Sequence, residues 1–216
     1  MSRNYYYIVG AALIVAVLAA TALVYPQLPS MVPVHWNSLG SVDGWGPKWT
    51  LFAIDPGLMS AILLLFTALP WLSPKHFEVE SFQSTNLYIM VVALALIAYV
   101  HALILANGLS WPIDVGRAIM GGVCLLIALL GNVLGKVRRN FFVGIRTPWT
   151  IANEQVWNAT HRFAAKALFA GGLVGLAAVV LRGAFWLPLA VLGAAALVPV
   201  AYSLFFYKDL QRQGKL

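Results

Sequence analysis

The sequence predicts an all-α, polytopic membrane protein, a bundle of six transmembrane helices, and two observations support this fold class. Of the 216 residues, 61% are hydrophobic and 10% are charged, and the mean hydropathy is +0.83, whereas in soluble domains about half the residues are apolar and about a quarter charged. The apolar residues also form runs of about 20, the length with which an α-helix crosses a bilayer. The alternating pattern of a membrane β-barrel is absent, so the backbone polar groups must be paired within helices.

Six such runs follow one another along the chain. We place the predicted spans at Tyr7–Val24, Leu51–Leu72, Asn86–Ala106, Ile113–Leu134, Phe163–Leu181 and Phe185–Phe205. They form a single membrane domain, residues 1–216, in which two connections are long enough to carry function: an outer loop at residues 26–50 and a cytoplasmic motif segment at residues 135–162. The pairs Gly131/Gly135 and Gly171/Gly175 allow helices to approach closely. We expect them to pack within the bundle, and dimerisation is the alternative.

The distribution of Lys and Arg predicts the orientation of the spans. If the N-terminus is cytoplasmic, eleven of the fourteen cations lie on the inner side and only Lys48, Arg117 and Arg182 lie outside. This agrees with the positive-inside rule and predicts a multi-pass cell-membrane protein with both termini in the cytoplasm. The net charge of +7 then requires no nucleic acid as a partner, while anionic membrane lipids would be attracted to the inner face.

The N-terminal segment has an alternative interpretation. Arg3, the apolar run after it and Ala20-Thr21-Ala22 also resemble a signal peptide with its cleavage site, and cleavage would leave five spans. Because all six spans agree with the charge distribution, the sequence favours an uncleaved first helix. Cys124 is the single cysteine and lies within a predicted span, so no disulfide is predicted and the thiol is expected to pack as a small apolar group.

The outer loop is rich in Pro and Gly, so we expect an ordered, turn-rich structure there, with Asp43-Gly44 as a turn signal. Its three Trp residues suit the membrane interface. Ionisable residues at the same depth within the spans are functional candidates, and a contact of His101 with Asp55 or with the loop is expected. Asp114 and Arg117, three residues apart, are expected to pair. The predicted outer polar site comprises His35, Asn37, Asp43, Asp55 and His101.

A metal in this outer loop is not predicted. One His and one Asp eight positions apart fall short of the three or four protein ligands that metal sites need. The alternative role for His35 and Asp43 is to tie the loop down by hydrogen bonds.

The inner segment contains a helix start at Thr147-Pro148, a capping side chain followed by proline. A helix from Ile151 to Leu181 would be roughly 46 Å long, more than the bilayer thickness. We therefore expect an interfacial helix or a cytoplasmic extension at Ile151–Arg162, with a bend before the fifth span. Helical spacing predicts a polar face there, formed by Glu154, Asn158 and His161 with Trp157 beside them.

Two motifs resemble a known family. The run G-N-x-x-G-K-x-R-x-N-x-x-x-G-I-R-T-P-W-T followed by E-x-V-W-x-x-T-H-R, at residues 131–162, resembles the signature of SdpI-like membrane proteins. The outer run P-x-H-W-N-x-x-G-x-x-D-G-W-G resembles the domain of unknown function that commonly precedes it. The resemblance implies immunity to a secreted, membrane-active toxin peptide, and a receptor role in which a cytoplasmic repressor is held at the membrane.

The resemblance and the chemistry of the side chains together define a candidate inner site for a ligand or partner. Its predicted residues are Asn132, Lys136, Arg138, Asn140, Arg146, Thr147, Trp149, Glu154, Trp157, His161 and Arg162. The arginines could bind a carboxylate or phosphate through paired hydrogen bonds, either on a lipid headgroup or on an acidic protein. Alternatively, they could form a structural network with Glu154.

A second function class remains open from the sequence: an enzyme or transporter acting on a phosphate-bearing lipid at the inner face. The chain contains no nucleophile elbow, phosphate-cradling glycine loop or HExxH motif. The sequence therefore favours a protein without catalytic residues or cofactor, with membrane lipids as partners. The resemblance adds a toxin peptide outside and a repressor inside as possible partners.

Overall fold

The computed structural model describes residues 2–37 and 40–216. Within them six helices are long and apolar enough to cross a membrane, which confirms the predicted all-α bundle. They are α1 (Arg3–Val24), α2 (Ile54–Leu72), α3 (Gln83–Gly108), α4 (Val115–Leu134), α6 (Glu154–Val180) and α7 (Trp186–Arg212). Their bounds lie within a few residues of the predicted spans at most ends, while α6 begins nine residues before the predicted Phe163 and α7 ends seven residues after the predicted Phe205.

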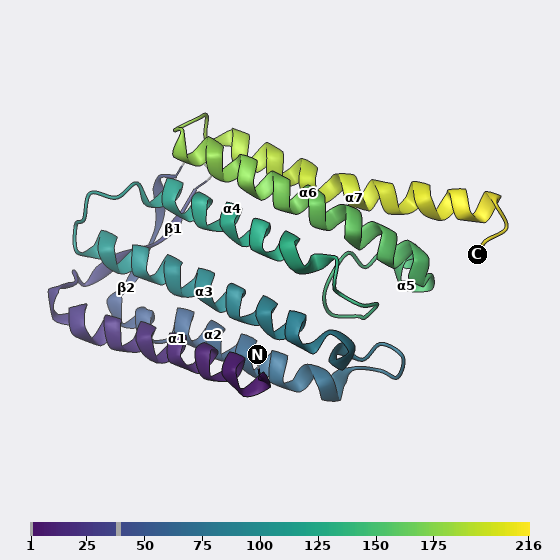
Figure 1. Cartoon of the computed structure of the whole chain (residues 1–216). Coiled ribbons are helices and arrows are strands. Elements are labelled where there is room, and N and C mark those ends of the chain that lie inside the picture. Colours follow the sequence, from purple (N-terminus) through teal and green to yellow (C-terminus); the bar gives the residue numbers. More distant parts are fainter. Residues whose placement is uncertain (1, 38–39) are drawn as a thin grey trace.

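The helices form one bundle with α3 and α4 in the middle (Figure 1). Helices α1 and α2 pack against α3, α6 packs against α4, and α7 packs against α6. Met59, Leu87, Met90 and Leu94 fill the space between the first three helices and are almost completely buried. Tight packing of this kind holds membrane helices together, because lipid supplies no hydrophobic drive to pair them.

Glycines provide the close contacts of the second half of the bundle. A Cβ atom on Gly172 of α6 would lie 2.5 Å from the Ala128 nitrogen and 2.7 Å from the Cys124 carbonyl oxygen, both in α4. A Cβ on Gly171 would lie 2.6 Å from the Cβ of Ala195 in α7. Cys124 itself is fully buried. The small residues therefore serve packing within the bundle, as the sequence predicted.

The outer loop forms a β-hairpin of β1 (Met31–Trp36) and β2 (Val42–Pro47), flanked by 3₁₀ turns at Tyr25–Gln27 and Lys48–Phe52. The predicted turn at Asp43-Gly44 was wrong, because both residues lie in β2. The chain reverses between Asn37 and Ser41, whose backbones are joined by a 2.9 Å hydrogen bond. Gly44 lies opposite His35, where a Cβ would be 2.7 Å from the His35 Cβ, so this glycine provides cross-strand space. Ser38 and Leu39 lie outside the described residues.

The inner segment begins where α4 ends and leads through a loop into the short helix α5 (Pro148–Ala152). Thr147 caps α5 in a capping box with Thr150, which confirms the predicted helix start. The predicted bend before the fifth span is present, but it lies earlier in the chain than the predicted start of that span at Phe163. The chain bends at Asn153, whose side chain caps α6 by accepting a hydrogen bond from the Val156 N–H at 3.0 Å. Residues 154–162 are therefore the first turns of α6, a helix of about 40 Å that is longer than the bilayer hydrocarbon is thick.

Candidate functional site

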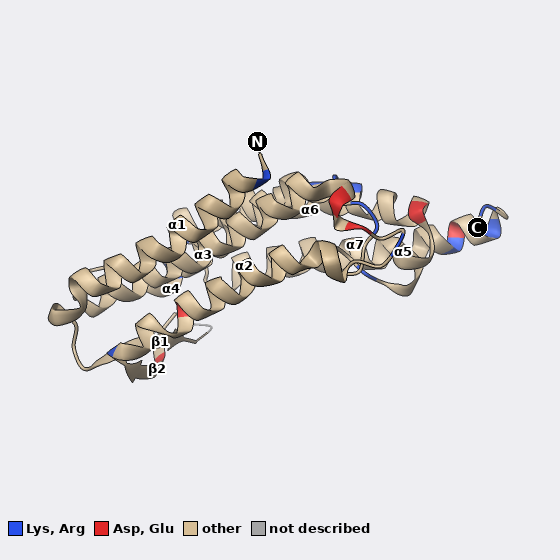
Figure 2. Cartoon of the chain, turned by 90° about the horizontal axis from the view of Figure 1, so that it is seen from below, with Lys and Arg blue, Asp and Glu red and all other residues tan. Residues whose placement is uncertain are grey.

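Charge is distributed unequally between the two ends of the bundle (Figure 2). Lys and Arg concentrate at the end that carries α5 and the C-terminus, away from the β-hairpin. The predicted outer residues accordingly lie at the hairpin end, and the predicted inner residues lie at the basic end. Each end forms its own candidate site.

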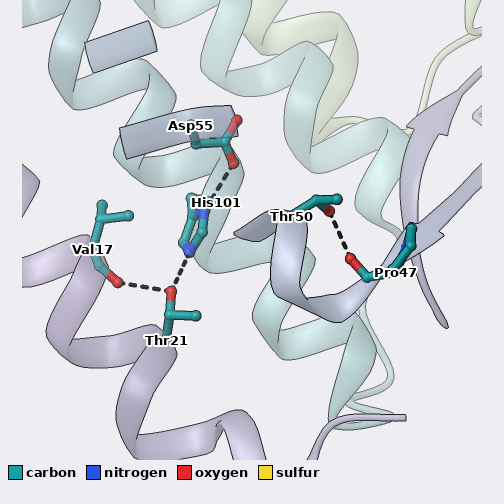
Figure 3. A network of polar contacts seen from close by, with 6 residues as sticks. All are labelled: Val17, Thr21, Pro47, Thr50, Asp55 and His101. Carbon is teal, nitrogen blue, oxygen red and sulfur yellow. Dashed lines mark hydrogen bonds and ion pairs between the residues drawn. The ribbon is translucent and has the colours of Figure 1, made fainter. Parts of the chain in front are cut away.

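At the hairpin end, His101 lies at the centre of a buried polar contact between three helices (Figure 3). Its Nδ1 is 2.8 Å from the Asp55 carboxylate at the start of α2, and its Nε2 is 2.7 Å from the Thr21 hydroxyl of α1. The His101 side chain is 1% exposed and that of Asp55 is 19% exposed. The expected contact between His101 and Asp55 is present, and Thr21 is a partner that sequence reasoning missed.

The Thr21 hydroxyl extends this group to the backbone of α1. It donates to the Val17 carbonyl oxygen at 2.9 Å and lies 2.7 Å from His101 Nε2. His101 therefore links α1, α2 and α3 through its contacts with Thr21 and Asp55.

The second His–Asp pair of this end lies on the hairpin surface. His35 Nδ1 is 2.5 Å from Asp43 Oδ1, with side chains 70% and 42% exposed. No hydrogen bond or ion pair in residues 2–37 and 40–216 connects this pair to His101 or Asp55. The predicted outer polar site is therefore divided into an exposed pair and a buried group. The described residues contain no cluster of three or more His, Cys, Asp or Glu that could hold a metal.

A pocket of ≈ 390 Å³ lies beneath the hairpin, between β1, α3, α4 and the start of α7. Its walls are mainly apolar, and His35 and Asn37 belong to its lining. Gly40, in the hairpin turn, touches the backbone of Gly116 in α4, where a Cβ on Gly116 would overlap Gly40. This contact holds the hairpin against the bundle and leaves the pocket beside it. The apolar lining residues are Val34, Trp36, Val100, Ile119, Met120, Val123, Phe185 and Leu189.

At the basic end, Asn140 organises the loop between α4 and α5. The residue is fully buried. Its amide nitrogen donates to the carbonyl oxygens of Arg138 and Val143 at 2.8 and 3.0 Å, and its amide oxygen accepts from the N–H groups of Phe142 and Val143 at 2.7 Å each. These four bonds use the whole hydrogen-bonding capacity of the side chain, so Asn140 fixes the loop and faces no ligand.

His161 attaches the same loop to α6. Its Nε2 accepts a 3.0 Å hydrogen bond from the Ile145 N–H, so the ring hydrogen is on Nδ1, which donates to the Trp157 carbonyl oxygen at 2.8 Å. The ring stacks on Trp157 with centroids 4.0 Å apart. Gly144, at φ +113°, has no room for a Cβ against this ring. Trp157 in turn donates from Nε1 to the Val137 carbonyl oxygen at 2.8 Å. His161 is therefore a neutral anchor with both nitrogens occupied.

The other predicted inner residues separate into structural and exposed groups. Trp149 donates to Ser203 of α7, and Thr147 bonds Thr150. Arg146 is exposed and donates to the Phe141 carbonyl oxygen. No ion pair joins Arg146 to Glu154 in the described parts of the chain, so the alternative of an arginine–glutamate network finds no support. Asn132 is exposed on α4.

Three predicted inner cations, Lys136, Arg138 and Arg162, line one pocket together with the first turn of α3. In a smaller neighbouring pocket of ≈ 240 Å³, Arg138 and Arg139 lie near Glu78 and Glu154. Hydrogen bonds from the backbone at Glu78 and from the His76 N–H, the latter 2.9 Å long, hold the pKa of the Glu78 carboxyl below its ordinary value. Sequence reasoning missed the α3 residues, for which the only signal was the polar run Gln83-Ser84-Thr85 before an apolar span.

Six membrane-crossing helices with a hairpin at one end and an anchored basic loop at the other define a multi-pass membrane protein. Two family models match it: the SdpI/YfhL protein family at residues 136–203 and the domain of unknown function DUF1648 at residues 12–59. One relative, the immunity protein SdpI of Bacillus subtilis (strain 168), is 27% identical over 157 residues, 70% of each chain. No solved structure matches significantly. The resemblance to SdpI-like membrane proteins is confirmed.

Proposed function

We propose that this protein gives a bacterial cell immunity to a secreted, membrane-active toxin peptide. The proposal is supported by similarity to a protein named for immunity, which extends over 70% of both chains. It is also supported by the two matched segments, one of which contains the hairpin, while the other contains the basic loop together with α6 and most of α7. Both termini are proposed to be cytoplasmic, since eleven of the fourteen Lys and Arg residues are then inside.

In this orientation the hairpin faces the outside, where a secreted peptide arrives. The observation that carries the proposal is the ≈ 390 Å³ apolar pocket beneath the hairpin, lined in part by His35 and Asn37. Trp45 and Trp49, each 60% exposed, lie on the same hairpin and 3₁₀ turn. An apolar cavity with a few polar groups and exposed aromatic rings is suited to binding an amphipathic peptide. His35, Asn37 and Asp43 are proposed as its polar contacts, while Asp55 and His101 support the fold beneath.

On the inner side, a repressor partner is proposed from the resemblance alone. Arg146 and Glu154 are exposed at the basic end and are proposed to contact it. The buried residues of the predicted inner site, Asn140, Trp157 and His161, would contribute by fixing the loop that presents them.

Immunity can be tested in a Bacillus subtilis strain that lacks its own SdpI and is challenged with that strain's killing peptide. We expect the native chain to restore growth. The double variant His35→Ala/Asp43→Ala should weaken protection about tenfold, the effect of losing about 1.4 kcal/mol of contact energy. Ser41→Ala, on the same hairpin, is the matched control and should protect like the native chain. Equal growth with and without the native protein, at confirmed membrane levels, would contradict the proposed function.

The orientation has a separate test. In a Cys124→Ala background, Ser41→Cys places a thiol on the exposed hairpin end, and Gln213→Cys places one at the exposed C-terminus. On intact cells, a membrane-impermeant maleimide should label the first and not the second, and permeabilisation should make both reactive. Labelling of only the C-terminal cysteine on intact cells would invert the proposed topology.

A further inference from the structure

The basic end contains a pocket of ≈ 760 Å³ whose walls come from distant parts of the chain. One wall is the loop after α4, which contributes Lys136 and Arg138. A second is α6, which contributes Arg162. The third is the start of α3, with Ser84 and Thr85 in its first turn. The volume lies within the range of about 300–1,000 Å³ typical of small-molecule sites.

The cations of this pocket are not engaged in a structural network. Lys136 and Arg138 make no side-chain hydrogen bond or ion pair with any described residue, and Arg162 donates only from Nε, to the Asn158 carbonyl oxygen at 3.2 Å. Glu80 is the one carboxylate among the lining residues, and it forms no ion pair within residues 2–37 and 40–216. Three cations and one anion give the lining a formal charge of +2.

The opposite wall adds neutral donors. The hydroxyls of Ser84 and Thr85 have no hydrogen-bond partner among the described residues. Both lie in the first turn of the 26-residue helix α3, where the helix dipole places partial positive charge. Cationic side chains, hydroxyl donors and a helix N-terminus facing one volume form a donor set that suits a tetrahedral oxyanion.

The position along the bundle identifies the source of that anion. The pocket lies at the inner end of α3, where the polar residues before Asn86 give way to the apolar run that crosses the membrane. A group bound at this level lies beside the lipid headgroups of the inner leaflet, which carry phosphates. We propose that this pocket is a binding site for the phosphate of an anionic phospholipid headgroup. The assignment to the inner leaflet rests on the proposed orientation of the chain, whereas the site itself does not depend on the proposed immunity function.

The test titrates protein solubilised in a maltoside detergent with dioctanoylphosphatidylglycerol, and follows binding by native mass spectrometry. We expect one saturable lipid per chain. The pocket variant Lys136→Gln/Arg138→Gln/Arg162→Gln should bind at least about tenfold more weakly, because it removes the charge-assisted hydrogen bonds. The matched control Lys208→Gln/Arg212→Gln/Lys215→Gln removes the same charge from α7 and the C-terminal residues after it, outside the pocket, and should change affinity by no more than about twofold.

A second variant, Ser84→Ala/Thr85→Val, retains every charge and decides the question if the pocket variant fails to fold. It should weaken lipid binding about threefold to tenfold through loss of the two hydroxyl donors. Equal weakening by the pocket and α7 variants would overturn the site in favour of diffuse attraction to the basic end. The last part of the test titrates the protein with inorganic phosphate alone. If it alone binds as tightly as the lipid, the ligand is the free ion and the lipid proposal fails.

Discussion

Replacing Gly172 by Ala should separate α4 from α6 and remove most of the folded protein. The added methyl group would lie 2.5 Å from the Ala128 nitrogen and 2.7 Å from the Cys124 carbonyl oxygen, both backbone atoms that cannot rotate away. The two helices would have to move apart along a contact that holds the centre of the bundle to its α6–α7 half. Overpacking against backbone is expected to cost about 3 kcal/mol or more of the free energy of unfolding. The measured quantity is the temperature at which half of the monodisperse protein in detergent is lost on heating.

The matched control is Gly193→Ala in α7, where a Cβ would meet nothing within 4 Å. The same chemical change at this open helical position should leave the protein as stable as before or stabilise it by up to about 1 kcal/mol, since Ala favours a helix over Gly. Equal melting midpoints for the two variants would show that α4 and α6 are not in backbone contact at Gly172.

The features of the fold that could be predicted from the sequence depend on residues close together in the chain. Six apolar runs predicted six spans, and Thr147-Pro148 predicted the start of α5, because hydropathy and capping each depend on a few adjacent residues. The turn at Asp43-Gly44 was wrong because Asp43 bonds to His35 and Gly44 lies opposite it across the hairpin. A two-residue turn signal does not show which residue of the other strand lies opposite it. The bend was predicted too late in the chain, because Asn153, within the inner segment, caps the start of α6.

The sequence predicted which residues gather at the candidate site, but not whether each of them faces a ligand or fixes the loop. Asn140 and His161 were expected to face a ligand, yet every polar atom of these side chains is bonded within the protein. Burial decides between the two roles, and burial depends on how the loop folds onto α6. Ser84 and Thr85 were missed because they are about 50 residues before the loop whose cations they face. His101 and Asp55 were paired correctly, since their shared depth in adjacent spans could be derived from the span positions.

Two His–Asp pairs at the hairpin end allow the same substitution to be compared in two environments. Asp55→Ala removes the carboxylate partner of His101, whose side chain is 1% exposed, and leaves Nδ1 without a partner between α2 and α3. Loss of one member of a buried polar pair is expected to lower the free energy of unfolding by about 3 kcal/mol. Asp43→Ala breaks the His35 pair, whose side chains are 70% and 42% exposed, and should cost no more than about 1 kcal/mol.

Thermal melting of the two purified variants, together with the growth assay, distinguishes a residue that stabilises the fold from one that contacts the peptide. Asp55→Ala should lower the melting midpoint strongly, and any loss of protection should follow the smaller amount of folded protein. Asp43→Ala should melt close to the native protein and weaken protection while membrane levels are unchanged, because the hairpin carboxylate is proposed to touch the peptide. The reverse pattern, a stable Asp55→Ala protein beside an unfolded Asp43→Ala protein, would contradict both assignments. It would make the surface pair the structural link and leave the buried group available for binding.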